Sequence, residues 1–193
     1  METEFNLYIK NMVCDRCILV VKQILHEADI EPLLVTLGRV RLSGAPDKSK
    51  LEQLDRALLD NGFERIDDKK SQLLEAIKST VIETIHHNSG FQLQVNWSHH
   101  LAEKLGYDYN YLSALFSTVT GVTLEQYIIR QKVEKVKEFL FYDELSVKEI
   151  AFKLGYSSVA HLSTQFKKVT GLTPTSFKES RESLNRKPLD GII

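Results

Sequence analysis

The chain has 193 residues, of which 42% are hydrophobic and 26% are charged, and its formal net charge at pH 7 is −1. This composition is that of an ordinary folded protein and argues against an intrinsically disordered chain. The N-terminus is acidic and no apolar run approaches about 18 residues, so neither a signal peptide nor a membrane-spanning helix is indicated. We therefore expect a cytoplasmic protein with no membrane partner.

The charge is distributed unevenly along the chain. Residues 1–67 carry a net charge of −3, whereas residues 148–187 carry eight Lys and Arg against three Glu, a net charge of +5. Nucleic-acid binding depends on basic side chains that neutralise phosphates. A contact with DNA is therefore most expected in the second of these segments.

Residues 1–67 have the pattern of a β-α-β-β-α-β unit, in which apolar spacing changes from a period of two to a period of 3.6 around residues 14–17. The expected elements are a strand at 5–9, a helix at 18–25, a hairpin around Gly38-Arg39, a helix at 51–58 that ends at Asn61-Gly62, and a strand at 63–66. This order predicts an α+β domain of the ferredoxin-like class.

Two cysteines, Cys14 and Cys17, stand where the first strand passes into the first helix. Amide groups at a helix N-terminus favour thiolates, which suits a soft metal ion or thiol-disulfide exchange. The run Asn11-Met-Val-Cys-Asp-Arg-Cys17 resembles heavy-metal-associated (HMA-like) domains, although Asn11 and Val13 replace the Gly and Thr of that family's loop. The resemblance implies copper(I) or another soft metal ion as ligand, while no cofactor is expected to be required. A thiol-disulfide couple and a domain without ligand stay open as alternatives.

A zinc site is less expected, because zinc needs two further ligands and the chain has no other cysteine. The histidines lie on other predicted elements, and we expect each of them to be solvated. They are His26, His86, His87, His99, His100 and His161.

Residues 68–90 are predicted to form a connecting helix with an apolar stripe from Leu73 to Ile85, ended by Asn88-Ser-Gly90. The stripe suits packing within the chain and packing against a second copy equally well. A homodimer is therefore one of two open alternatives.

An internal repeat is the most informative feature of the chain. Leu101-Ala-Glu-Lys-Leu-Gly-Tyr107 recurs as Ile150-Ala-Phe-Lys-Leu-Gly-Tyr156, and Leu112-Ser-Ala-Leu-Phe116 recurs as Leu162-Ser-Thr-Gln-Phe166. The separation is 49 residues before the turn and 50 after it, so the second turn contains one extra residue. Each copy predicts a helix, a turn with glycine and a second helix.

These copies define an all-α double helix-turn-helix domain over residues 91–183, followed by a tail at 184–193. Apolar residues at helical spacing from Ile129 to Leu140 predict one long helix that joins the two copies. Capping boxes are expected at Thr123 and Ser146.

The second helix of each copy is expected to bury one face and to present the other to DNA. The core positions are Leu112, Phe116 and Val119 and their counterparts Leu162, Phe166 and Val169; Trp97 is also expected in the core. The residues expected to contact DNA are Asn110, Ser113, Ala114 and Ser117 in the first copy, and Ser158, Val159, His161, Ser163, Thr164, Gln165, Lys167 and Lys168 in the second. Lys167 and Lys168 are the expected phosphate contacts. Neither face contains Arg, so direct base readout is expected to be modest.

Residues 101–178 resemble the DNA-binding domain of AraC/XylS-family transcription regulators, most specifically in the segment from Ile150 to Pro174. The resemblance implies a sequence-specific regulator whose two recognition helices enter successive major grooves, and no enzymatic activity. It implies double-stranded DNA as partner, with RNA polymerase as a further candidate. The chain departs from the family at Lys132 and Val136, where Arg and a small residue are usual, and at Ala114 and Thr164, where Arg is common.

Two other functional classes remain as alternatives. The first is a metal carrier or thiol oxidoreductase built on Cys14 and Cys17. The second is a protein-interaction adaptor whose double helix-turn-helix domain has lost DNA binding. Salt dependence separates the second alternative from a DNA-binding protein, because phosphate neutralisation weakens steeply as salt rises.

Overall fold

The computed structural model describes residues 5–87, 95–142, 145–179 and 189–192, and the chain divides into two compact units, Met1–Glu83 and Thr84–Ile193. The division falls within the segment expected as the connecting helix. Among the described residues, no helix has the length and apolar character needed to cross a membrane.

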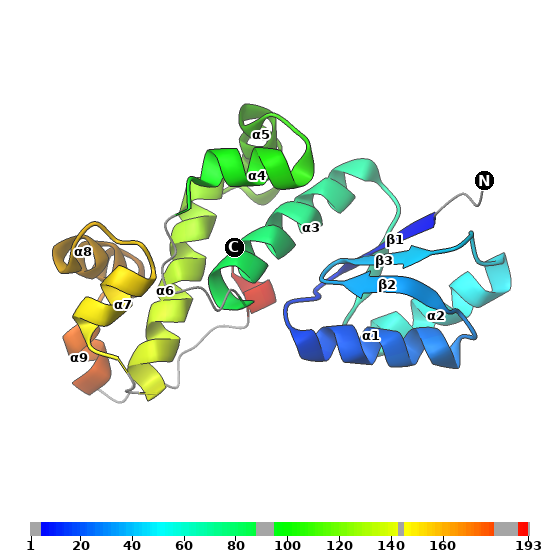
Figure 1. Ribbon diagram of the computed structural model, residues 1–193, viewed down its shortest axis with the longest axis horizontal. Helices are drawn as coiled ribbons and strands as arrows, with labels where there is room; N and C mark the ends of the chain where they lie inside the picture. Colours follow the sequence, from blue (N-terminus) through cyan, green and yellow to red (C-terminus); the bar gives the residue numbers. More distant parts are fainter. Residues whose placement is uncertain (1–4, 88–94, 143–144, 180–188, 193) are drawn as a thin grey trace. The chain divides into compact units, whose positions relative to one another are not determined.

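The N-terminal unit combines a small antiparallel sheet with three helices (Figure 1). Its elements are β1 (Phe5–Lys10), α1 (Asp15–Glu27), β2 (Pro32–Thr36), β3 (Arg39–Leu42), α2 (Lys48–Asp60), β4 (Glu64–Ile66) and α3 (Lys69–Ile82). The strand order is β2-β3-β1-β4, and each neighbouring pair is antiparallel. The predicted order β-α-β-β-α-β is therefore present in an antiparallel sheet.

The core of this unit lies between the sheet and the helices α1 and α2. Leu7 and Ile9 alternate with more exposed residues along β1, and Leu7 stands opposite Val40 of β3. From the helices, Val21 and Leu54 are fully buried in the same cluster. Because side chains alternate across a strand and recur every 3.6 residues on a helix, the apolar pattern of the sequence places these residues on facing surfaces.

Polar contacts fix the ends of these elements. The Asp47 carboxylate accepts from the backbone N–H of Lys50 at 2.9 Å and begins α2. Arg65 of β4 donates to both carboxylate oxygens of Asp55 on α2, at 2.7 and 2.9 Å, and contacts Asp67 as well. This bidentate ion pair joins the last strand to the second helix.

The loop that carries the cysteines is shaped by Asn11, whose φ of 70° lies in the left-handed region. Asn tolerates this conformation better than most residues other than Gly. Its side-chain Nδ2 donates to the carbonyl of Gly62 at 2.9 Å, and the following Met12 is buried in the core. Asn11 therefore holds the left-handed backbone conformation of this loop and joins it to the end of α2.

The connecting segment begins at Asp68, whose carboxylate accepts from the N–H groups of Lys70 and Ser71, and continues as α3. The π-helical turn η1 (Glu83–His87) follows directly. The expected end at residues 88–90 lies outside the described residues. Leu74 and Ile77 of the apolar stripe are buried within the single chain, and α3 contacts β1.

The C-terminal unit consists of two helix pairs on a long central helix (Figure 1). Its helices are α4 (Trp97–Leu105), α5 (Tyr109–Thr120), α6 (Leu124–Tyr142), α7 (Val147–Lys153), α8 (Val159–Thr170), α9 (Pro174–Glu179) and the short η3 (Leu189–Gly191). Helix α6 has 19 residues, a length of about 28 Å, and contacts α5 near one end and α7 and α8 near the other. The predicted long helix between the two copies is confirmed.

The two pairs repeat their core contacts as well as their sequence. Phe116 of α5 packs against Tyr127 with ring centroids 5.0 Å apart, and Phe166 of α8 packs against Phe177 at 5.5 Å. Phe116 and Phe166 are fully buried. The structural repeat therefore extends through the start of the helix that follows each recognition helix.

Two core predictions for these helices are wrong. Val119 and Val169 are 53% and 41% exposed, and Leu115 is buried in α5 instead. Each valine lies in the last turn of its helix, close to the terminal Gly121 or Gly171. Helical spacing identifies a face but not how far along that face the packing partners reach, and here they do not cover the last turn.

Trp97 is half-buried rather than a core residue, because it is the first residue of α4, directly after the N-cap Asn96.

The prediction that every histidine is solvated is also wrong. The imidazole of His86 is largely buried, and its Nε2 lies 3.0 Å from Oε1 of Gln131. His100 is half-buried, and its Nε2 lies 2.9 Å from Oγ1 of Thr84. In each ring, Nε2 has a hydrogen-bond partner that is distant in sequence, so this nitrogen does not need water as a partner.

Candidate nucleic-acid interface

The second helix of each pair, α5 and α8, begins at a well-formed N-cap. The Asp108 carboxylate accepts from the N–H of Asn110 at 2.8 Å, and the Ser158 hydroxyl accepts from the N–H of His161 at 3.0 Å. Gly106 and Gly155 in the preceding turns have φ of 72° and 68°, a conformation that favours glycine. These contacts fix where each recognition helix starts and in which direction it leaves the turn.

A hydrogen bond joins the second turn to the central helix. Helix α7 ends at Lys153 with Leu154 as C-cap, and the carbonyl of Leu154 accepts from Nζ of Lys132 on α6 at 3.0 Å. The ammonium group also lies over the ring of Tyr156, 5.2 Å from its centroid. Lys132, which stands where Arg is usual in the resembling family, thus fastens the second turn to the central helix.

The residues expected to contact DNA are all exposed or half-buried, and none lies in the core. The exposed ones are Asn110, Ala114, Ser158, Val159, His161, Thr164, Lys167 and Lys168, and the half-buried ones are Ser113, Ser117, Ser163 and Gln165. The structure thus groups them on two helices, four on or near α5 and eight on or near α8.

Several hydroxyl groups on these helices already donate to their own backbone. Oγ of Ser117 donates to the Ser113 carbonyl at 2.8 Å, and Oγ1 of Thr164 donates to the Ala160 carbonyl at 2.9 Å. A hydroxyl group has one hydrogen but two lone pairs. With the hydrogen used inside the helix, Ser117 and Thr164 can offer DNA only an acceptor.

The two recognition helices differ in charge. Helix α5 contains no Lys, Arg, Asp or Glu, whereas α8 ends with the exposed pair Lys167 and Lys168 in its last turn. An exposed aromatic pair lies beside the start of α5, where Tyr107 and Tyr111 stack with ring centroids 5.7 Å apart and are each nearly half exposed. Sequence reasoning missed Tyr107; its signal is the four-residue spacing from Tyr111, which places both rings on one side of the helix start.

The thiol pair lies in the N-terminal unit. Cys14 is the N-cap of α1, and its Sγ is 3.4 Å from Sγ of Cys17. Partial burial opposes ionisation of Cys14, but hydrogen bonds from Cys17 and Arg16 hold its pKa below the usual value; burial and the Cys14 sulfur raise the pKa of Cys17. Among the residues that the structure describes, no third Cys, His, Asp or Glu joins them as a potential metal ligand. The pair can therefore offer a metal ion two sulfur ligands.

Comparison with known proteins decides the class of the C-terminal unit. Residues 101–180 match a protein family described as helix-turn-helix domain. This segment is a helix-turn-helix domain similar to those of AraC/XylS-type regulators. The helix-turn-helix domain belongs to a family of DNA-binding regulators and not to an enzyme family.

Curated relatives match the chain over part of their own length. An uncharacterized HTH-type transcriptional regulator, YtdP of Bacillus subtilis, is 26% identical over 131 residues, which are 68% of this chain and 17% of the relative. The HTH-type transcriptional activator RhaS of Escherichia coli is 30% identical over 92 residues, 48% of this chain and 33% of the relative. The chain thus spans a third or less of the length of these relatives.

Among solved structures, the C-terminal domain of AraT, a response regulator from Geobacillus stearothermophilus, is similar with a TM-score of 0.49 and 26% identity. The similarity covers 59% of this chain and 89% of that domain.

Proposed function

We propose that the protein is a sequence-specific DNA-binding transcription regulator whose helix-turn-helix domain places α5 and α8 in successive major grooves of one duplex. The proposal rests on one observation above all: two helix pairs, each with a left-handed glycine in its turn, a capped second helix and a buried phenylalanine in its core, stand on one continuous helix, α6. Paired recognition helices reach successive major grooves when they lie about 34 Å apart.

The side chains on the two helices indicate how DNA would be read. Asn110 and Gln165 carry amides, which pair best with adenine in the major groove. Ser117 and Thr164, limited to accepting, favour the amino groups of adenine or cytosine over acceptor-only positions on guanine. Lys167 and Lys168 would contact phosphates without reading sequence.

The direct test of this proposal is selection of bound fragments from genomic DNA, followed by anisotropy titration of the selected duplex at several salt concentrations. We expect affinity to fall linearly with the logarithm of salt concentration and to exceed that for an unrelated duplex by about a thousand-fold or more. A protein-interaction adaptor would show neither the selection nor the salt dependence. As a regulator, the protein would change access of RNA polymerase to the bound promoter.

We further propose that the N-terminal unit, with its β2-β3-β1-β4 sheet, adjusts DNA binding through a soft metal ion at Cys14 and Cys17. The donor set fits such an ion: two soft sulfur atoms 3.4 Å apart at a helix start, one with a lowered pKa. Copper(I) accepts soft thiolate ligands, whereas zinc needs four ligands and the described residues provide two. When bound, the ion would neutralise the thiolate charge at the start of α1.

This second proposal is tested by titrating the full chain with copper(I) in competition with a colorimetric chelator, under reducing conditions. We expect one ion per chain, lost in Cys14→Ser and in Cys17→Ser, and a change in DNA affinity only when the ion is bound. If instead DNA affinity follows oxidation of the two thiols and ignores copper(I), the pair is a redox couple and the metal proposal is wrong.

A further inference from the structure

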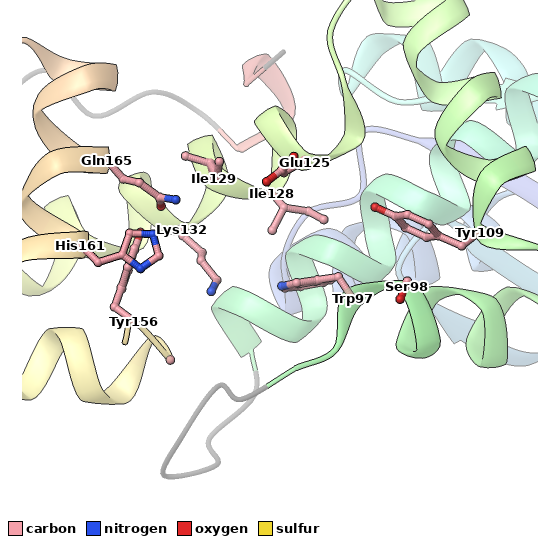
Figure 2. Close-up of a pocket in the computed structure, with 11 residues that line it drawn as sticks. Trp97, Ser98, Tyr109, Glu125, Ile128, Ile129, Lys132, Tyr156, His161 and Gln165 are labelled. Carbon is pink, nitrogen blue, oxygen red and sulfur yellow. The ribbon is translucent and has the colours of Figure 1, made fainter. Parts of the chain in front are cut away.

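A cavity of about 350 Å³ lies within the C-terminal unit, between the start of α4, the central helix α6 and the recognition helix α8 (Figure 2). Its walls combine aromatic rings with polar and charged side chains. The residues that matter for its chemistry are Trp97, Tyr109, Lys132, Tyr156, His161 and Gln165.

The cavity contains a cation that lacks an acidic partner. Nζ of Lys132 donates to the carbonyl of Leu154 and lies over the ring of Tyr156, and within the described part of the chain no carboxylate pairs with it. An ammonium group carries three N–H donors, so two are not used by these contacts. Burial of Lys132 lowers its pKa, as expected for a cation that no carboxylate compensates.

Two uncharged donors near this cation are also unsatisfied. Nε1 of Trp97 and the hydroxyl group of Tyr156 are buried and have no hydrogen-bond partner among the described residues. Figure 2 shows the indole nitrogen of Trp97 at the end of the ring that points toward Lys132. Burial raises the pKa of Tyr156, so its hydroxyl group remains a donor. Buried donors without partners are rare in folded proteins and call for an explanation.

We propose that this cavity binds a small aromatic carboxylate, whose carboxylate group takes the place of the missing anion at Lys132 and whose ring lies between Trp97 and Tyr156. The volume is within the range of small-molecule sites, which begin at about 300 Å³. Glu125 also lines the cavity, at a distance from Lys132 in Figure 2, and would repel a second negative charge on the ligand. The site therefore fits a monoanion.

A DNA phosphate fits the cavity less well than a free carboxylate. The backbone of a duplex is continuous, so a phosphate reaches exposed side chains such as Lys167 more readily than a cation whose side chain is largely buried. The unsatisfied donors of Trp97 and Tyr156 have almost no solvent contact. The backbone of a continuous duplex cannot approach them.

A ligand here would be coupled to DNA binding, a consequence that rests on the proposed function. His161 and Gln165, expected to contact DNA, line the cavity from α8, and Tyr109 lines it from the first residue of α5. A bound carboxylate would touch both helix pairs at once. It would therefore change the position of α5 relative to α8, or compete with DNA for the side chains of α8.

The experiment uses the full chain without DNA and exploits Trp97, which is the chain's single tryptophan. Benzoate is the probe and benzamide is the matched control, because benzamide has the same ring and no charge. We expect a saturable change in tryptophan fluorescence with benzoate, and at least ten-fold weaker binding of benzamide. Lys132→Met should abolish the benzoate response, whereas Lys104→Met, which removes an exposed lysine of α4, should leave it intact.

Because Lys132 also holds the Leu154 carbonyl, a second variant separates binding from folding. Tyr156→Phe removes a hydroxyl group that has no partner, so it should keep the thermal transition of the parent and weaken benzoate binding about ten-fold. Equal responses to benzoate and benzamide, unchanged benzoate affinity in both variants, or no saturable response up to about 10 mM would overturn the proposal. None of these outcomes involves DNA, so they leave the proposed function to its own test.

Discussion

The imidazole of His86 is a half-buried polar group that its surroundings hold neutral. Its Nε2–H donates to Oε1 of Gln131, whose amide nitrogen in turn donates to the hydroxyl group of Tyr127 and to the carbonyl of Leu189, both at 3.1 Å. Burial lowers the pKa of His86 from 6.5 to about 4. The folded protein therefore binds this proton less readily than the unfolded chain.

The free energy of unfolding should therefore decrease as the pH is lowered from about 6.5 to about 4. A depressed histidine pKa contributes stability that is complete above about pH 6.5 and is lost as pH falls to about 4, by up to about 3 kcal/mol. Urea unfolding of the full chain at pH 7, 5.5 and 4.5 measures this change. His86→Gln, which cannot be protonated, should show a flatter profile; an identical pH dependence in the variant would contradict the assignment.

At the level of residues, the strongest electrostatic prediction is that Lys167 and Lys168 contact DNA phosphates. Replacing both with Ala should weaken DNA binding to a similar extent on different sequences and lower the slope of log affinity against log salt by about 2, because two phosphates lose their partners. Anisotropy titrations at four salt concentrations give this slope. Lys48→Ala, at a side chain 92% exposed in the N-terminal unit, is the matched control. A slope that is the same in all three proteins would show that the pair is only solvated.

At the level of elements, the turn before each recognition helix depends on a glycine in the left-handed region. In Gly106, φ is 72° and an added Cβ would meet nothing within 4 Å, so the effect of a substitution comes from the backbone alone. Gly106→Ala should destabilise the protein by about 1 kcal/mol. Gly44 lies outside the left-handed region, and an added Cβ would again meet nothing within 4 Å, so Gly44→Ala should change the unfolding midpoint little. Equal destabilisation by the two substitutions would contradict the claim that the turn requires glycine at position 106.

The same elements show how far the sequence could predict the fold. The helices of the repeat and the Ser146 capping box depend on contacts within a few residues, and both are present in the structure. At Thr123 the hydroxyl group accepts from the N–H of Gln126, the forward half of the predicted capping box. Local contacts of this kind are encoded in neighbouring positions and can be recognised there.

The rest depended on contacts between distant positions. His86 and Gln131 are 45 residues apart, and Lys132 reaches a carbonyl group 22 residues away. Nothing in the local pattern distinguishes these side chains from solvated ones, so the buried histidine and the cavity beside Trp97 could not be foreseen. The sequence predicted that the candidate DNA contacts lie outside the core of the second helix of each pair, and the structure places them there. The internal hydrogen bonds of Ser117 and Thr164 required coordinates.

At the level of the whole molecule, positive charge and candidate base contacts are divided unequally between the two helix pairs. Helix α8 combines Lys167 and Lys168 with the amide of Gln165, whereas α5 relies on uncharged groups. We therefore expect the second pair to supply most of the affinity and the first pair to supply register. Asn110→Ala should alter base preference at one half of the site with little effect on the salt slope, as measured by binding to a set of single-base variants of the selected duplex.

Hydroxyl-radical footprinting of the full chain on its selected duplex tests the central claim most directly, because the claim requires both helix pairs to contact one face of DNA. We predict two protected segments whose centres lie about 10 base pairs apart, with protection at one of them weakened when Lys167 and Lys168 are both replaced by Ala. A single protected segment that is unaffected by this double substitution would contradict the account.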